Sequence, residues 1–379
     1  MNRKHPSFPI FDRRRFVQSI ATGAAGALVP GWAMRNAAAD DAVNPFAKDQ
    51  VDAAVDRAIK VLLQIQQRGR SGAIYDRRNP VTMTSLAIMA MAGVGVQPNE
   101  PSPRGVAMRK ALDFVLQPQH QDREGYFGRS EGSRMYGHGI TTLMLTEMVG
   151  MGVDDEQDRL IAERLDAAIN LILASQKTAK RDPRAQGGWR YEPNARDSDL
   201  SITVWQLMAL RSAKNDGMDI PASAIDEAVG YLENSYTSRL DRSGMPREDA
   251  AGFSYTPDNK HPTFTMTSAG LLAMQVCGRY ESPMVRGAAE WLLQRQLRRR
   301  ERFFMYGVYY YSQGMHQRGG KYAIEARKRV EQILLEIQRP DGSWIGPESE
   351  EAKWGVVYAT SLAILSLSVK YHYLPIYQR

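Results

Sequence analysis

A glycine followed closely by an aromatic or large apolar residue recurs along most of this 379-residue chain. Each copy precedes an apolar stretch that carries a threonine, 12 residues beyond Gly72 in the first copy and 18 residues beyond Gly342 in the last. The five copies are Gly72-Ala73-Ile74-Tyr75 with Thr84, Gly125-Tyr126-Phe127 with Thr141, Gly188-Trp189 with Thr203, Gly252-Phe253 with Thr267, and Gly342-Ser343-Trp344 with Thr360. Self-similarity of so long a period is typical of repeated supersecondary units.

The spacing of apolar residues predicts that the unit is a helical hairpin. Apolar residues recur at helical spacing, and amphipathic segments alternate with segments that are apolar nearly all round. A helix with a polar stripe faces water, whereas one that is apolar all round is buried. The sequence therefore predicts an all-α (α/α)6 toroid of six helical hairpins. The expected pairs are Val51–Gln67 with Val81–Val94, Gly105–Leu116 with Arg134–Met151, Glu156–Gln176 with Asp197–Asn215, Pro221–Tyr236 with Thr263–Arg279, Pro283–Gln296 with Phe303–Arg318, and Gly319–Gln338 with Glu351–Tyr371.

In this arrangement the inner helices begin just after the glycine–aromatic turns, so the turns gather at one end of the ring. The fifth pair has no such turn, and the run from Phe303 to Gly307 is expected to stand in for it. We expect no linker that divides the body into two domains.

The first 39 residues look like an export signal rather than part of the fold. Arg13-Arg14-Arg15-Phe16 is a twin-arginine pattern, an apolar stretch runs from Ile20 to Trp32, and Ala37-Ala38-Ala39 suits cleavage. The sequence therefore predicts a signal peptide over 1–39, a toroid domain over 40–379, and a periplasmic or extracytoplasmic location. No later stretch reaches the ~18 apolar residues of a transmembrane helix.

The basic pI of about 9.3 comes mostly from this signal segment. Residues 1–39 hold six basic residues and one acid, so five of the seven net positive charges lie there. The body is left with a net charge of about +2, which disfavours nucleic acid as a partner.

The turn motifs resemble the repeats of squalene and oxidosqualene cyclases and of protein prenyltransferase β subunits. Gln338-Arg339-Pro340-Asp341-Gly342-Ser343-Trp344 looks like the cyclase repeat, and Gln186-Gly187-Gly188-Trp189 looks like the prenyltransferase turn. The resemblance covers about Val51 to Tyr371 and implies the same toroid. In it the glycine allows a tight turn, the aromatic residue wedges between hairpins, and the glutamine is expected to cap the next helix.

The resemblance also suggests a candidate acid. Squalene cyclases protonate an alkene with a D-x-D-D run, and Asp197-Ser198-Asp199-Leu200 is similar but lacks the final aspartate. It implies Asp199 as proton donor, helped by Asp197, because such an acid must be a polarised carboxyl group in a dry pocket. The alternative is structural, with Asp197 capping the helix and Asp199 in its first turn.

No metal or other cofactor is expected. The zinc-binding D-x-C pair of the prenyltransferases is absent, because Gln275 precedes Cys277 at the aspartate position. With one family motif absent and the other incomplete, the sequence leaves open whether the protein is an enzyme.

Two further polar residues are candidates for a catalytic site. His138 lies between two glycines at the start of the second inner helix, and Glu147 lies deeper in the same helix. Either residue could be the polar partner of Asp199. The alternatives are a packed histidine that bonds a carbonyl and a carboxylate with a structural partner.

Aromatic residues near the turns suggest a lined cavity. Aromatic faces suit isoprenoid chains and stabilise carbocations, but they also stack on sugars or simply fill cores. The candidate ligand-binding residues are Tyr136, Trp189, Tyr191, Trp205, Tyr255, Tyr306, Tyr310, Trp354 and Tyr358.

The sequence thus predicts an exported toroid with an aromatic-lined cavity for an isoprenoid or other apolar ligand. A non-catalytic scaffold and a carbohydrate-active (α/α)6 enzyme remain alternatives. The tail from Tyr371 to Tyr377 is expected to pack on the body, with peripheral membrane contact as the alternative. The sequence makes no prediction of oligomeric state.

Overall fold

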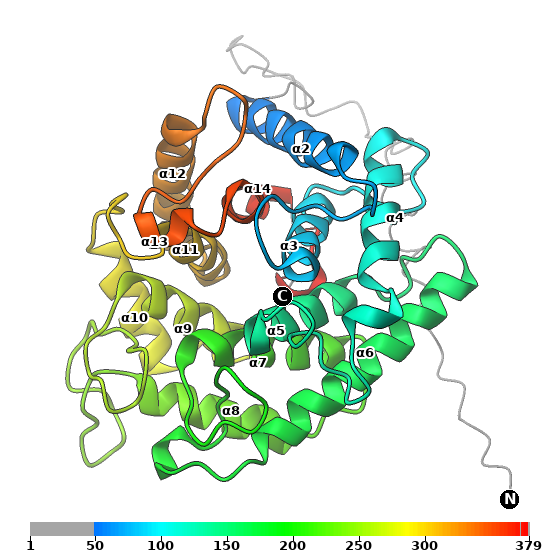
Figure 1. Ribbon diagram of the computed structural model, residues 1–379. Coiled ribbons are helices and arrows are strands. Elements are labelled where there is room, and N and C mark those ends of the chain that lie inside the picture. The colour runs from blue at the N-terminus through cyan, green and yellow to red at the C-terminus, as the bar shows by residue number, and fades with distance from the viewer. Residues whose placement is uncertain (1–48, 372, 378–379) are drawn as a thin grey trace, which may run out of the picture.

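The computed structural model describes residues 49–371 and 373–377, and over these residues it is built of helices arranged as two concentric rings (Figure 1). The predicted all-α (α/α)6 toroid is confirmed, whereas the predicted signal segment lies outside the described residues. The inner helices are α3 (Pro80–Ala92), α5 (Arg134–Glu147), α7 (Leu200–Asn215), α9 (Phe264–Val276), α11 (Phe304–Arg318) and α14 (Val356–Leu367). The outer helices are α2 (Gln50–Arg68), α4 (Pro103–Val115), α6 (Asp155–Gln176), α8 (Ala222–Ser235), α10 (Pro283–Leu293) and α12 (Gly320–Ile337).

The inner helices form a closed ring. Each contacts the next one in chain order, and α14 returns to contact α3. Each inner helix packs mainly against the outer helix that follows it, and α14 packs against α2. This differs from the predicted pairing of each outer helix with the inner helix after it. The ring is therefore sealed by its first helix lying on its last.

Burial follows the apolar pattern of each helix. In α9 all thirteen residues are buried, whereas in α12 only Ala326, Val330 and Leu334 are buried. The apolar side chains of α9 itself, mostly leucine, methionine and alanine, point to every side of the helix, so α9 is buried inside the ring. The polar face of α12 instead meets water.

Three predicted boundaries were wrong. The helix α7 begins at Leu200, so Asp199 is its N-cap and Asp197 lies in the preceding loop. The expected final helix is divided into α13 (Ser349–Ala352) and α14. The expected fifth turn is absent, because Phe304 to Gly307 already belong to α11 and Phe303, with φ of 53°, is its N-cap.

Two features hold the turns: a close approach of the turn glycine to the next outer helix, and a hydrogen bond that recurs between turn and inner helix. Gly187 has φ of 86°, and a Cβ atom there would lie 2.1 Å from the carbonyl oxygen of Glu227 on the next outer helix. The backbone N–H of Trp189 donates to Oγ1 of Thr203 at 3.0 Å. The same bond joins Ile74 to Thr84, Phe253 to Thr267, and Trp344 to Thr360, at 2.9 to 3.1 Å. In these four repeats the threonine therefore fixes the turn to its inner helix.

The resemblance suggested that the repeated glutamine caps the next helix, but in the structure it does not. Nε2 of Gln176 donates to the carbonyl oxygens of Gly187, at 2.9 Å, and of Ala224 in α8, at 2.8 Å. It thus joins the turn to the next outer helix. Equivalent pairs of bonds are made by Gln66 to Gly72 and Ala107, by Gln121 to Gly125 and Arg164, and by Gln338 to Gly342 and Ala54.

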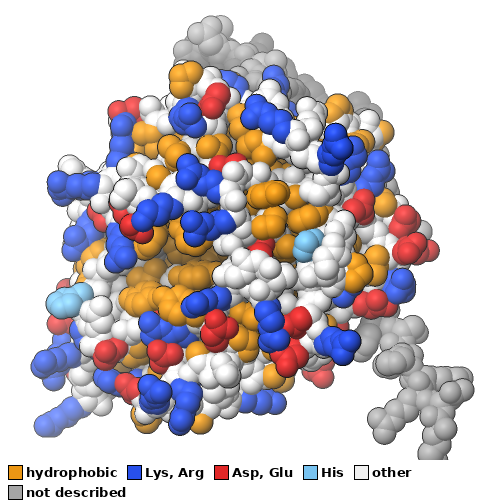
Figure 2. Space-filling model, viewed as in Figure 1, with side chains coloured by type: hydrophobic (Ala, Val, Ile, Leu, Met, Phe, Trp, Pro, Cys, Tyr) orange, Lys and Arg blue, Asp and Glu red, His pale blue; other side chains and the backbone are white. Residues whose placement is uncertain are grey.

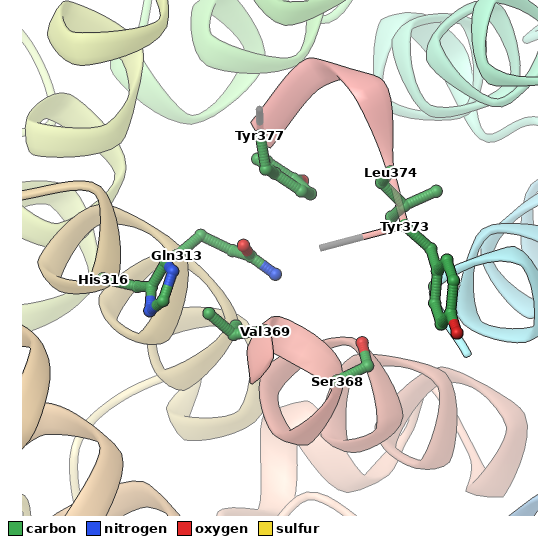
Figure 3. Close-up of a pocket in the computed structure, with 8 residues that line it drawn as sticks. Gln313, His316, Ser368, Val369, Tyr373, Leu374 and Tyr377 are labelled. Carbon is green, nitrogen blue, oxygen red and sulfur yellow. The ribbon is translucent and has the colours of Figure 1, made fainter. Parts of the chain in front are cut away.

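The C-terminal segment lies across the end of the ring at which the inner helices finish, as predicted for a packed tail (Figures 1 and 3). We call this end the lower end. Leu374, Ile376 and Tyr377 are buried, and Tyr377 bonds the hydroxyl of Tyr309 on α11. A small hollow lies beside the tail, lined among others by Gln313. Within the described part of the chain, no helix combines the length and the apolar character needed to cross a bilayer.

Candidate functional site

The mouth of the ring is the end at which all six inner helices begin. It consists of segments 69–79, 116–133, 177–199, 236–263, 294–303 and 338–355. Each segment also binds the start of the preceding inner helix, so the mouth is cross-linked all the way round. In each bond the helix supplies the donor and the segment supplies the acceptor. Asp76 accepts from α14, Glu131 from α3, the Tyr191 carbonyl from α5, the Tyr255 carbonyl from α7, the Arg302 carbonyl from α9, and Glu351 from α11.

Asp199 is a fully buried carboxyl group at this end. Its Oδ1 accepts the N–H of Ile202 at 2.9 Å, which places the side chain over the positive end of α7. Burial raises the pKa of Asp199 to about 7, against the opposing effects of this hydrogen bond and of the Arg190 charge. The group is therefore divided between acid and carboxylate near neutral pH.

Arg190 links this buried acid to the surface. Its Nε lies 3.4 Å from Oδ2 of Asp199, and its Nη1 lies 2.8 Å from Oδ2 of the exposed Asp197. The guanidinium also lies over the rings of Tyr191 and Tyr255, at 5.2 and 5.8 Å from their centroids. The hydroxyl groups of these two tyrosines are 2.6 Å apart. Asp197, Asp199 and two predicted aromatic residues are thus held together by one arginine.

A second group of predicted residues forms a hydrogen-bonded network beside Asp199. The hydroxyl of Tyr136 bonds the side chain of Ser201, whose oxygen is 3.4 Å from the hydroxyl of Tyr306. That same hydroxyl accepts the indole N–H of Trp205 at 2.7 Å and the hydroxyl of Tyr310 at 3.2 Å. The network joins α5, α7 and α11 across the ring.

Glu351 is a second buried carboxyl group at the mouth. Its two oxygens accept the N–H groups of Met305 and Tyr306 at 3.0 and 3.1 Å. Burial raises the pKa of Glu351 to about 7. Tyr358 donates to it at 3.3 Å, and Trp354 lies beside Tyr358 and under Arg78. Burial and the nearby Glu351 raise the pKa of the Tyr358 hydroxyl well above its usual value.

Aromatic rings fill the axis below these groups. Trp205 stacks on Tyr309, with ring centroids 5.8 Å apart and planes within 10°, and Tyr309 in turn meets Tyr377 of the tail. All three side chains are buried. Figure 2 shows apolar side chains gathered in a hollow on the mouth face. Aromatic side chains therefore close the axis of the ring below the mouth.

His138 lies away from this group, between α5 and the outer ring. Its Nδ1 accepts the N–H of Phe127 at 3.4 Å, and its Nε2 is 3.2 Å from the Ala168 carbonyl oxygen. It therefore takes the place that threonine takes in the other turns, while Thr141 bonds Ser85 instead. Burial lowers the pKa of His138 to about 4.

The side chains of two other predicted residues also lie apart from Asp199. Oε1 of Glu147, at the lower end, accepts the hydroxyl of Ser212 at 2.8 Å and the N–H of Ile376 at 3.3 Å. The indole N–H of Trp189 donates to the Ile172 carbonyl oxygen of α6, towards the outer ring. The structure does not bring these side chains to Asp199.

Sequence reasoning missed Arg190, Ser201 and Glu351. Glu351 was expected to be the first residue of a long helix, and nothing in its spacing marks it as buried. Arg190 carried a weak signal, since a basic residue inside a glycine–aromatic turn is next to the candidate acids. Among the described residues, no group of three or more metal-ligating side chains could hold a metal ion.

No protein-family model matches this chain, and no curated protein matches its sequence. Solved structures do share its fold. A variant of the type II terpene cyclase MstE from Scytonema, in complex with geranylgeranyl dihydroxybenzoate, is 13% identical over 86% of this chain and 98% of its own, with a TM-score of 0.51. A possible GH105 member from Salmonella enterica serovar Paratyphi A is 12% identical over 86% and 95%, with a TM-score of 0.50. The chain thus has the α/α toroid fold found in a terpene cyclase.

Proposed function

We propose that this protein binds an isoprenoid or similar apolar ligand in the mouth of its toroid, with Asp199 as the acid nearest the ligand. One observation carries the proposal: a fully buried carboxyl group with a pKa near 7 lies next to partly buried tyrosines at the mouth, on the face where Figure 2 shows an apolar hollow. The partly buried faces of Tyr136, Tyr255 and Tyr358 suit an unsaturated chain. The terpene cyclase that shares this fold binds a prenylated substrate, which supports the choice of ligand.

If the protein is catalytic, we propose that Asp199 donates its proton to a carbon–carbon double bond. The proton and the alkene electron pair form the new C–H bond, which leaves a carboxylate on Asp199 and a carbocation on the ligand. The positive charge of Arg190 stabilises the carboxylate, and the tyrosine faces stabilise the cation. Asp197 acts only through Arg190. We propose structural roles for His138 and Glu147, since their hydrogen bonds hold a turn and the tail.

The experiment is native mass spectrometry of the protein purified in mild detergent from its own cell envelope. We expect a co-purifying isoprenoid whose occupancy falls at least tenfold in Tyr136→Ala. Tyr75→Ala is the matched control, because Tyr75 belongs to a mouth segment but is 42% exposed. An empty protein that also fails to bind added geranylgeraniol would overturn the proposal.

A carbohydrate ligand is the second candidate, favoured by one observation. Asp199 and Glu351 are two buried carboxyl groups at one mouth, and glycoside hydrolysis uses a pair of carboxyl groups. Both oxygens of Glu351 already accept backbone N–H groups, which weighs against this candidate. Binding of an oligosaccharide but not of geranylgeraniol would favour it.

We also propose that the protein is exported by the twin-arginine route. The support is the Arg13-Arg14-Arg15 run and the alanines before Asp40. Amino-terminal sequencing of the protein from its native host should give a chain that begins just after Ala39, and an intact Met1 would contradict this.

A further inference from the structure

The two ends of the toroid carry opposite net charge. The six mouth segments contain 22 Lys and Arg residues against 17 Asp and Glu residues, a net charge of +5. The described segments at the lower end, 49, 93–102, 148–154, 216–221, 277–282, 319, 368–371 and 373–377, contain two basic and six acidic residues, a net charge of −4. The described part of the molecule is therefore polarised along its axis, and its mouth would face an anionic surface.

Exposed apolar side chains also gather at the mouth. Leu240 is 45% exposed and Met245 is 44% exposed, and both lie near the tip of the hairpin-like loop between α8 and α9. The loop is closed by an N–H···O bond of 2.8 Å from Asp241 to Met245. Arg239, Arg242 and Arg247 in the same loop are also exposed, as are Asp241, Glu248 and Asp249, so the loop carries no net charge of its own. Exposed apolar side chains at a loop tip fit the boundary between lipid headgroups and acyl chains.

The densest positive charge lies in the neighbouring mouth segment, 294–303. It holds five arginines and one glutamate, and Arg298 and Arg300 are both exposed. Figure 2 shows Lys and Arg side chains spread around the apolar hollow of this face. Basic side chains near a membrane attract anionic headgroups within about one Debye length.

We propose that the mouth face docks on an anionic lipid bilayer, with Leu240 and Met245 entering the headgroup region and the arginines contacting lipid phosphates. An anionic polymer could form ion pairs with the arginines, but it would offer Leu240 and Met245 no apolar phase to enter. The opposite end suits a membrane less well, because Leu374, Ile376 and Tyr377 of the tail are buried, although Tyr373 is exposed, and because the charge there is negative. Docking would turn the mouth towards the lipid phase.

The test is co-sedimentation of the full chain with vesicles of phosphatidylcholine that contain 30% phosphatidylglycerol, compared with pure phosphatidylcholine. We expect binding to the anionic vesicles only, lost on raising the salt to ~0.5 M. The double variant Arg298→Glu, Arg300→Glu should reduce the bound fraction at least fivefold. The double variant Leu240→Ser, Met245→Ser should reduce it at least twofold at unchanged net charge.

The matched control is Lys60→Glu with Lys328→Glu, which makes the same charge change at exposed positions on the outer helices. An equal loss of binding in this control, or equal binding to neutral vesicles, would overturn the proposal. So would binding to polygalacturonate but not to anionic vesicles. Retention of geranylgeraniol is measured without vesicles, so failure of docking and failure of the proposed ligand are told apart.

Discussion

Gln338 donates a hydrogen bond of 2.9 Å to the carbonyl oxygen of Ala54, although 284 residues separate them in the sequence. This bond lies at the seam where α2 meets the last repeat. The same amide also holds Gly342 at 2.9 Å, as the glutamines of three other repeats hold their own turns. The ring is thus closed by the interaction that joins its repeats elsewhere.

Replacement of this glutamine should therefore loosen the closure. We expect Gln338→Ala to lower the free energy of unfolding by about 1–3 kcal/mol, because two carbonyl groups lose a donor. Urea denaturation measures the change. Gln294→Ala, at an exposed glutamine directly after α10, is the control and should change stability by less than about 0.5 kcal/mol. Equal effects of the two variants would contradict this role of Gln338.

The turn glycines offer a matched pair of substitutions. Gly187 and Gly217 have similar φ of 86° and 88°, but only a Cβ atom at Gly187 would meet another atom, the Glu227 carbonyl oxygen at 2.1 Å. Gly217→Ala should cost about 1 kcal/mol from backbone strain alone. Gly187→Ala should cost several kcal/mol, because α8 must also move away. Thermal denaturation of both variants tests this, and a similar loss in each would show that the close approach is unimportant.

His138 predicts a loss of stability in acid. Its pKa is lowered to about 4 when folded, from an ordinary 6.5, so the unfolded chain binds a proton more readily. Its contribution to stability is complete above pH 6.5 and falls as the pH drops towards 4. Between pH 7.5 and 5 this amounts to about 2 kcal/mol. His138→Thr, which restores the residue type of the other repeats, should lose that much less stability than the wild type over the same range.

Asp199 predicts the opposite dependence. Its pKa is raised from 3.8 to about 7 on folding, so the folded state keeps its proton longer than the unfolded chain. Stability from this group is greatest below pH 3.8 and falls as the pH rises towards 7. Asp199→Asn should remove about 3 kcal/mol of this decline between pH 5 and 8. A wild type and variant with parallel stability curves would mean that the carboxyl group is not buried.

The repeat pattern was enough to predict the toroid, because each copy carries its own turn glycine and its own helix threonine. The order of packing was not predictable in the same way. Whether α3 packs on α2 or on α4 depends on the direction in which the ring turns, and the hydrophobic pattern of the helices is the same in both cases.

The site was predicted in part. Aromatic residues predicted near the turns do lie at the mouth, because a residue close to the start of an inner helix must lie at that end of the ring. His138 matches the alternative of a packed histidine that bonds a carbonyl, but its role in the turn was hidden because Thr141, three residues later, looked like the repeated threonine. The spacing of the repeats does not reveal that a histidine replaces the threonine as hydrogen-bond acceptor in this turn. Glu351 was missed for a related reason: its burial depends on contacts with α11, about 46 residues away.

The central claim is that the mouth holds an apolar ligand above Asp199, and photo-crosslinking tests it most directly. The probe is geranylgeraniol with a diazirine at its far end, offered to the full chain and followed by peptide mapping. We predict labels on peptides that contain Tyr136, Tyr255 or Tyr358, and competition by unlabelled geranylgeraniol. Labels confined to the outer wall, for example around Ile324, which is 73% exposed, or no competed label at all, would contradict it.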